Sequence, residues 1–68
     1  MKYQILGWSD NRGAKLLRET YHYNEAKSWL ADYVRLDGLK KSGWEEILIQ
    51  NTDGEPKATF DNYGWTHY

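Results

Sequence analysis

The chain contains no cysteine, and this limits how its 68 residues can hold a single fold. Neither disulfide bonds nor thiolate metal sites can stabilise it, so stability must come from burying apolar side chains. The aromatic residues offer much of that surface, because each of the four Trp, six Tyr and one Phe can bury about 150–250 Å². We therefore expect a single domain over residues 1–68, with most of the rings in its core.

The formal net charge is −1, but the charged residues are unevenly distributed. Residues 1–41 carry eight Lys and Arg against five Asp and Glu, whereas residues 42–68 carry one against five. This balance argues against a strongly basic nucleic-acid-binding protein, because affinity for phosphate depends on accumulated positive charge. No segment has the apolar length of a signal peptide or a bilayer-spanning helix, so we expect a cytoplasmic protein without membrane attachment.

The clearest secondary-structure signal is the amphipathic stretch NEAKSWLADYVRLDG. Its apolar residues recur at helical spacing and form one stripe: Ala26, Trp29, Leu30, Tyr33 and Val34. Asn24 is a suitable N-cap and Gly38 a suitable stop, which predicts a helix over about residues 25–37.

Four strands are predicted around this helix. They cover about residues 2–8, 14–23, 43–50 and 56–63. The turn-forming stretch SDNRG separates the first two, and Asp53-Gly54 marks a hairpin turn between the last two. Residues 14–23 also contain Leu and Lys residues that a helix would tolerate, so a helix is the alternative there.

The turn at Asp53-Gly54 sets the register of the last two strands. It places Ile49 opposite Ala58, and Ile47 opposite Phe60, on one apolar face. These elements predict a small single-domain α+β fold, ββαββ, in which a four-stranded antiparallel sheet has one helix packed on one face. The expected core combines Ile47, Ile49 and Phe60 with Trp29, Leu30, Tyr33 and Val34 of the helix.

One helix can cover only one face of this sheet, so the other face is the first candidate for a binding surface. It is expected to display apolar and aromatic side chains, several from the C-terminal aromatic tail 64–68: Trp44, Leu48, Tyr63, Trp65 and Tyr68. Carboxylates would flank this face at Glu45, Glu46 and Asp61. Trp and Tyr are enriched among the residues that contribute most to binding. The competing interpretation is that the tail folds back and buries these rings in a second small core.

The sequence holds no motif that indicates catalysis. Glu46 and Asp61 would be cross-strand neighbours that could share a divalent ion, but two solvated carboxylates are the simpler interpretation. His67, on the tail, does not complete a metal site. The serines lack the setting of a nucleophile, and the glycines form no phosphate-binding run. We therefore predict no enzyme, no cofactor and no metal site.

The N-terminal hairpin is a second candidate surface. It carries basic side chains beside aromatic ones: Tyr3, Trp8, Arg12, Lys15 and Arg18. Such a platform suits single-stranded nucleic acid, because bases stack on rings while phosphates meet cations. The competing interpretation is an ordinary charged edge hairpin, since charges on an edge also prevent aggregation.

The sequence thus predicts a small protein-interaction module, an adaptor or inhibitor, whose aromatic sheet face binds a protein partner with a basic surface. The acidic flank would attract such a partner electrostatically. Two alternatives stay open: single-stranded nucleic-acid binding through the N-terminal hairpin, and a homodimer that uses the aromatic face while its function lies elsewhere.

Overall fold

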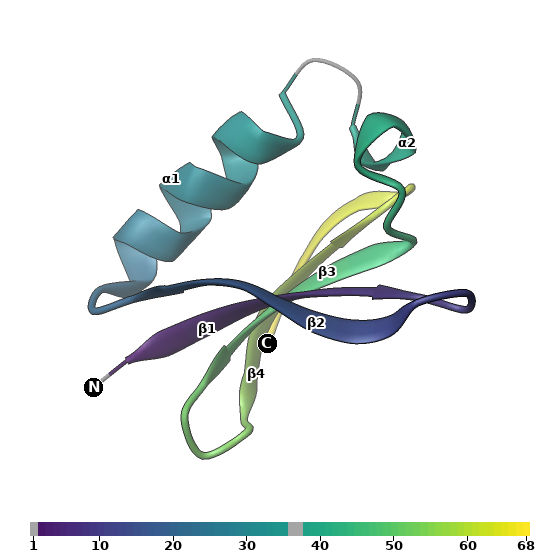
Figure 1. The fold of residues 1–68 in the computed structure, drawn as a ribbon. Coiled ribbons are helices and arrows are strands. Elements are labelled where there is room, and N and C mark those ends of the chain that lie inside the picture. Colours follow the sequence, from purple (N-terminus) through teal and green to yellow (C-terminus); the bar gives the residue numbers. More distant parts are fainter. Residues whose placement is uncertain (1, 36–37) are drawn as a thin grey trace.

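A computed structural model describes residues 2–35 and 38–68 as a five-stranded sheet with a helix on one face (Figure 1). The elements follow the chain as β1 (Tyr3–Ser9), β2 (Gly13–Thr20), α1 (Tyr23–Tyr33), α2 (Leu39–Ser42), β3 (Glu46–Asn51), β4 (Pro56–Asp61) and β5 (Gly64–His67). All neighbouring strands are antiparallel, in the spatial order β2-β1-β3-β4-β5. The predicted α+β class and antiparallel sheet are confirmed. The predicted four strands and ββαββ order are wrong in detail, since a fifth strand and the short helix α2 are present.

The β3–β4 hairpin keeps the predicted register from Ile47 to Ile49, but the register shifts at Gln50, which pairs with Pro56. The loop has three residues, not the predicted two, because the Asn51 backbone N–H donates to the Glu55 carbonyl at 3.0 Å. Ile47 opposes Phe60, Leu48 opposes Thr59, and Ile49 opposes Ala58. The Asn51 side-chain carbonyl closes the turn by accepting hydrogen bonds from the backbone N–H groups of Asp53 and Glu55, at 2.9 and 3.0 Å. Side-chain acceptors of this kind replace backbone partners in tight turns and thereby fix the loop.

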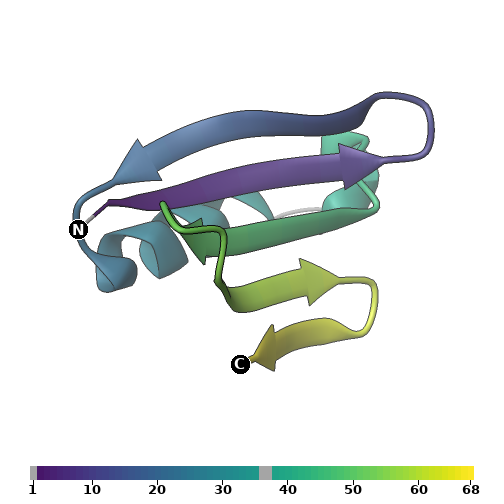
Figure 2. The same cartoon turned by 90° about the horizontal axis from the view of Figure 1, so that it is seen from below.

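Strand β5 is formed by residues that the sequence assigns to a tail. The Asp61 carboxylate accepts the Tyr63 backbone N–H at 2.9 Å, which starts a turn. Gly64 completes the turn with a φ of 102°, a conformation open to a residue without a Cβ. Trp65 then opposes Phe60, and the chain returns along β4 (Figure 2).

Strand β2 confirms the strand interpretation over the helical alternative, but it ends at Thr20. Its pairing with β1 slips by one residue: Ile5 opposes Arg18 and Leu6 opposes Leu16. Leu17 is therefore the extra residue of a β-bulge, and it packs against the core.

Helix α1 starts and ends earlier than predicted. Its N-cap is His22, in extended conformation, and the Asn24 side chain does not cap it. The Thr20 hydroxyl donates to the His22 carbonyl at 3.0 Å and ties the end of β2 to the helix start. The helix ends at Tyr33, and the last two predicted positions, 36–37, lie outside the described residues.

The core lies between α1 and one face of the sheet. Its buried members are Ile5, Ala26, Leu30, Val34, Leu39, Trp44, Ile47, Ile49 and Ala58. Trp29 and Phe60 are only partly buried against this cluster. Tyr33, predicted to be in the core, is exposed and stacks on Trp29, with 4.8 Å between ring centroids.

Trp44 belongs to this core and is only 5% exposed, although the sequence predicts it on the opposite face. The difference arises because β3 begins at Glu46, so strand alternation does not apply to Trp44. The indole lies against Gly7, where an added Cβ would be 2.6 Å from ring carbons. The Arg12 guanidinium lies over the indole, 4.5 Å from its centroid, and donates to the Ser42 carbonyl at 3.4 Å.

The contact between Gly7 and Trp44 predicts that Gly7→Ala destabilises the protein. A methyl group here must displace a rigid, buried ring, so we expect a loss of about 1–3 kcal/mol in unfolding free energy. Urea denaturation followed by tryptophan fluorescence measures this loss. In a Trp44→Leu background, the same substitution should cost less, because the ring that it displaces is gone. Equal stability of Gly7→Ala and wild type would contradict the packing described.

Candidate interaction surface

The side of the sheet without a helix carries the residues that alternate with the core residues. Ile5, Ile47 and Ile49 point toward α1, so their neighbours along each strand point the other way. Cross-strand partners share a face, and the register therefore assigns this side: Gln4, Leu6 and Trp8; Ala14, Leu16 and Glu19; Glu46, Leu48 and Gln50; Thr59 and Thr66. We call it the open sheet face. Figure 2 views it directly, with the helices behind the strands.

The centre of the open sheet face is apolar. One row crosses three strands from Leu16 through Leu6 to Leu48, and Trp8 lies in the next row. Leu16 is 45% exposed and Trp8 43%, while Leu6 and Leu48 are half-buried. Apolar side chains gathered in this way differ from scattered surface leucines and are typical of interaction sites.

A ladder of amide side chains borders this apolar row. The Gln50 side chain donates to the Gln4 carbonyl oxygen at 3.0 Å, and the Gln4 amide donates to the Glu19 carboxylate at 3.3 Å. The ladder links β3, β1 and β2 across one row of the sheet. It uses part of the hydrogen-bonding capacity of these groups and holds the Glu19 carboxylate at the rim.

The charges on the open sheet face are mainly negative. Register and alternation place Glu19, Glu46 and Asp61 on it. Among the strand residues that the structure describes, Lys57 of β4 is the one cation that alternation places on this face. The open sheet face thus combines an apolar centre with a rim of net negative charge.

The five residues predicted to share one aromatic face lie in different places. Only Leu48 is on the open sheet face. Trp44 is in the core, and Trp65 lies on the α1 side of β5, because it opposes Phe60. Tyr63, in the β4–β5 turn, is 99% exposed, and Tyr68, which follows β5, is 71% exposed. The structure therefore does not bring these rings together.

The predicted acidic flank is partly retained. Glu46 opposes Trp8 and Asp61 pairs with Gly64, both at the border of the open sheet face. Glu45 instead precedes β3, where its carboxylate accepts the Asp10 backbone N–H at 2.6 Å. Within residues 2–35 and 38–68, no three His, Cys, Asp or Glu side chains gather to form a metal site.

The predicted basic and aromatic platform of the N-terminal hairpin is divided between two faces. Trp8 lies on the open sheet face, while Lys15 and Arg18 oppose residues of the α1 side. Tyr3 also faces α1, and Arg12 covers the core tryptophan. A base stacked on Trp8 would thus meet neither of the two β2 cations on its own side of the sheet.

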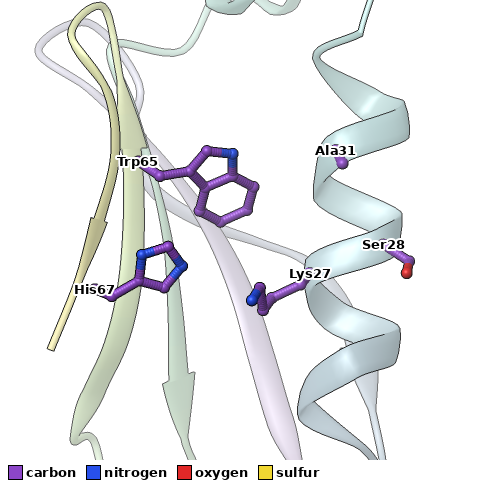
Figure 3. Close-up of a pocket in the computed structure, with 5 residues that line it drawn as sticks. All are labelled: Lys27, Ser28, Ala31, Trp65 and His67. Carbon is purple, nitrogen blue, oxygen red and sulfur yellow. The ribbon is translucent and has the colours of Figure 1, made fainter.

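A groove between α1 and β5 was not anticipated from the sequence (Figure 3). Its volume is about 400 Å³, and its lining residues are Lys27, Ser28, Ala31, Trp65 and His67. The rings of Trp65 and His67 stack, with centroids 5.6 Å apart and planes at 12°. The i, i+2 spacing of Trp65 and His67 is the sequence signal that would have revealed it, had residues 64–67 been assigned to a strand.

Tyr23 lies in the first turn of α1, where its surroundings shift the pKa of its hydroxyl. Its hydroxyl donates to the Lys57 backbone carbonyl at 3.4 Å, and its ring lies 5.6 Å from that of Tyr3. Burial, and secondarily the nearby Tyr3 hydroxyl, raises the pKa of Tyr23 above the ordinary value of 10.0.

The chain matches no protein-family model, no curated protein and no solved structure. In the part of the chain that the structure describes, no helix has the length and apolar character needed to cross a membrane.

The raised pKa of Tyr23 predicts a loss of stability at alkaline pH. The neutral phenol is favoured in the folded state, so its contribution is complete below pH 10 and is lost as pH rises through the folded pKa. Chemical denaturation at a series of pH values should show this decline, and Tyr23→Phe should make it shallower. An unchanged decline in Tyr23→Phe would assign it to other groups.

The exposure of the apolar row predicts that its edge can become polar at little cost to folding. We expect Leu16→Gln to change the unfolding free energy by less than about 0.5 kcal/mol, as is usual for exposed positions. The buried Leu30 of α1 is the matched comparison, and Leu30→Ala should cost about 2–5 kcal/mol. Denaturation midpoints measure both variants, and a large loss for Leu16→Gln would make the row part of the core.

Proposed function

We propose that this protein is a non-enzymatic interaction module that binds a partner protein through its open sheet face. The observation that supports this most directly is the row Leu16–Leu6–Leu48, with Trp8 beside it, on a face that no helix covers. An apolar centre surrounded by polar groups is the usual anatomy of a protein interface.

The negative charges at the rim favour a partner with a positively charged surface. Glu19, Glu46 and Asp61 outnumber Lys57, so a complementary surface would present apolar side chains bordered by Lys and Arg. A second copy of this chain would bring the same carboxylates together across a two-fold axis, which opposes self-association through this face. Nucleic acid would meet the same negative rim.

The proposed anchors differ from those that the sequence favours. Trp8 is now the principal anchor, because its large half-exposed ring can enter a pocket of the partner. Leu48, Glu46 and Asp61 keep their predicted roles at this surface. Trp44 is not an anchor, because its ring is buried in the core and could reach a partner only if the core opened.

Site-specific photocrosslinking tests this proposal. A benzophenone amino acid at position 16 lies in the apolar row, and the same group at the exposed position 32 of α1 is the control. Irradiation in cells should give an adduct with a different protein from position 16 and not from position 32. Trp8→Ser should remove the adduct, and Glu46→Lys should weaken it.

The Kd for the purified partner then measures how much each anchor contributes to binding. We expect Trp8→Ala to raise the Kd at least about tenfold, as for a central interface residue. The association rate should fall as salt is added, because the rim charges attract the partner. The proposal fails if position 16 gives no adduct, or gives only adducts with a second copy of this chain.

A further inference from the structure

The outer edge of β5 presents unpaired backbone groups. The Tyr68 N–H donates to the Lys57 carbonyl on β4 at 3.1 Å. Backbone groups of successive residues in an antiparallel strand point alternately to its two sides. The backbone N–H and C=O groups of Thr66 therefore point toward β4, as those of Tyr68 do, while the backbone groups of Trp65 and His67 point outward. β5 is the last strand of the sheet on this side.

The other edge of the sheet, β2, is protected against pairing. Its bulge at Leu17 interrupts the regular spacing of backbone groups, and Lys15 and Arg18 add charge. β5 pairs with β4 without any slip in register, and its sequence GWTH contains neither Lys nor Pro. Of the two edges, β5 is the one able to accept another strand.

The side chains of the same two edge residues line the α1–β5 groove. Trp65 packs edge-to-face against Phe60, with 5.4 Å between centroids, and it also stacks on the His67 ring. Lys27 extends from α1 toward these two rings (Figure 3). A strand added to β5 would direct every second side chain to the α1 side of the sheet, beside the groove.

The groove favours acidic and apolar side chains. Among residues 2–35 and 38–68, those that line it include Lys27 and no carboxylate, and the Trp65 and His67 rings form its flat wall. A second copy that paired through its own β5 would bring Gly64–His67 to this edge, a strand that contains no carboxylate to pair with Lys27. A peptide that carries Asp or Glu between apolar residues is complementary to both the charge and the rings.

We propose that the β5 edge and the α1–β5 groove form a peptide-binding site for an extended, acidic segment of a protein. The segment adds to the sheet as a sixth strand. Its backbone hydrogen-bonds to Trp65 and His67, one apolar side chain packs on the ring of Trp65, and a carboxylate pairs with Lys27. This site is separate from the open sheet face, whose anchors lie on β1, β2 and β3.

Two substitutions at position 67 separate the contribution of the backbone N–H to peptide binding from that of the imidazole. His67→Ala removes the imidazole and keeps the edge N–H, whereas His67→Pro removes both and leaves the hydrogen bonds to β4 intact. The probe is a linear peptide of about 12 residues, selected from a random display library on the wild-type protein. Fluorescence anisotropy should give a Kd for His67→Pro that is about tenfold higher than for His67→Ala. Circular dichroism checks that both variants fold.

Lys27 provides the test of charge. We expect the selected peptides to be enriched in Asp and Glu. Lys27→Glu should raise their Kd about tenfold, and the Kd for Lys27→Gln should lie between the wild-type value and the Lys27→Glu value. Amide hydrogen exchange gives an independent readout. The amides of Trp65 and His67 should exchange fast in the free protein and become protected when the peptide is bound.

Several results would overturn the proposal. One is a selection that yields no binder, and another is equal affinity in His67→Ala and His67→Pro. If Leu16→Gln abolished peptide binding and His67→Pro did not, the peptide would bind the open sheet face instead. Light scattering that shows a wild-type dimer, abolished only by His67→Pro, would assign the edge to a second copy. The photocrosslink at position 16 should persist in His67→Pro, so the two sites can fail independently.

Discussion

The packing of α1 on one face of the sheet is the constraint from which the rest of the structure follows. Leu30 and Ala26 join Ile5, Ile47 and Ile49 in one buried cluster. A chain of this length without disulfide bonds depends on such a cluster for its stability. One helix of 11 residues cannot also cover the reverse face. The same contact that stabilises the fold therefore leaves Leu6, Leu16 and Leu48 without a helix above them, on the face that we propose binds a partner.

The features that the sequence predicted well are those set by neighbouring residues. The Asp53-Gly54 turn and the period of two placed Ile47 opposite Phe60, and helical spacing identified α1. Features set by distant contacts were missed. The indole of Trp44 takes its place in the core because Gly7, 37 positions earlier, has no side chain. The pairing of β1 with β3 also joins residues that are distant in sequence, and it determines which β3 side chains lie beside those of β1 on the open sheet face.

The candidate surfaces show the same division between local and distant information. Alternation along β1 places Leu6 and Trp8 on the face opposite to Ile5, which is information that the strand carries locally. The composition of each face could not be predicted, because one bulge at Leu17 changes which β2 side chains lie beside those of β1. The turn at Gly64 had a similar effect, since it placed Trp65 on the α1 side.

The two proposed sites differ in charge and in what they recognise. The open sheet face has a negative rim and offers side chains alone, because the backbone groups of its central strands are already paired. The β5 edge offers free backbone groups next to a groove that contains Lys27. Side-chain surfaces select folded partners by shape, whereas strand edges bind extended segments through backbone hydrogen bonds, and the side chains beside the edge set the preferred sequence. A protein with both could hold a folded domain and an unfolded segment at once, because neither site uses the anchors of the other. This arrangement suits an adaptor better than an inhibitor that covers one surface.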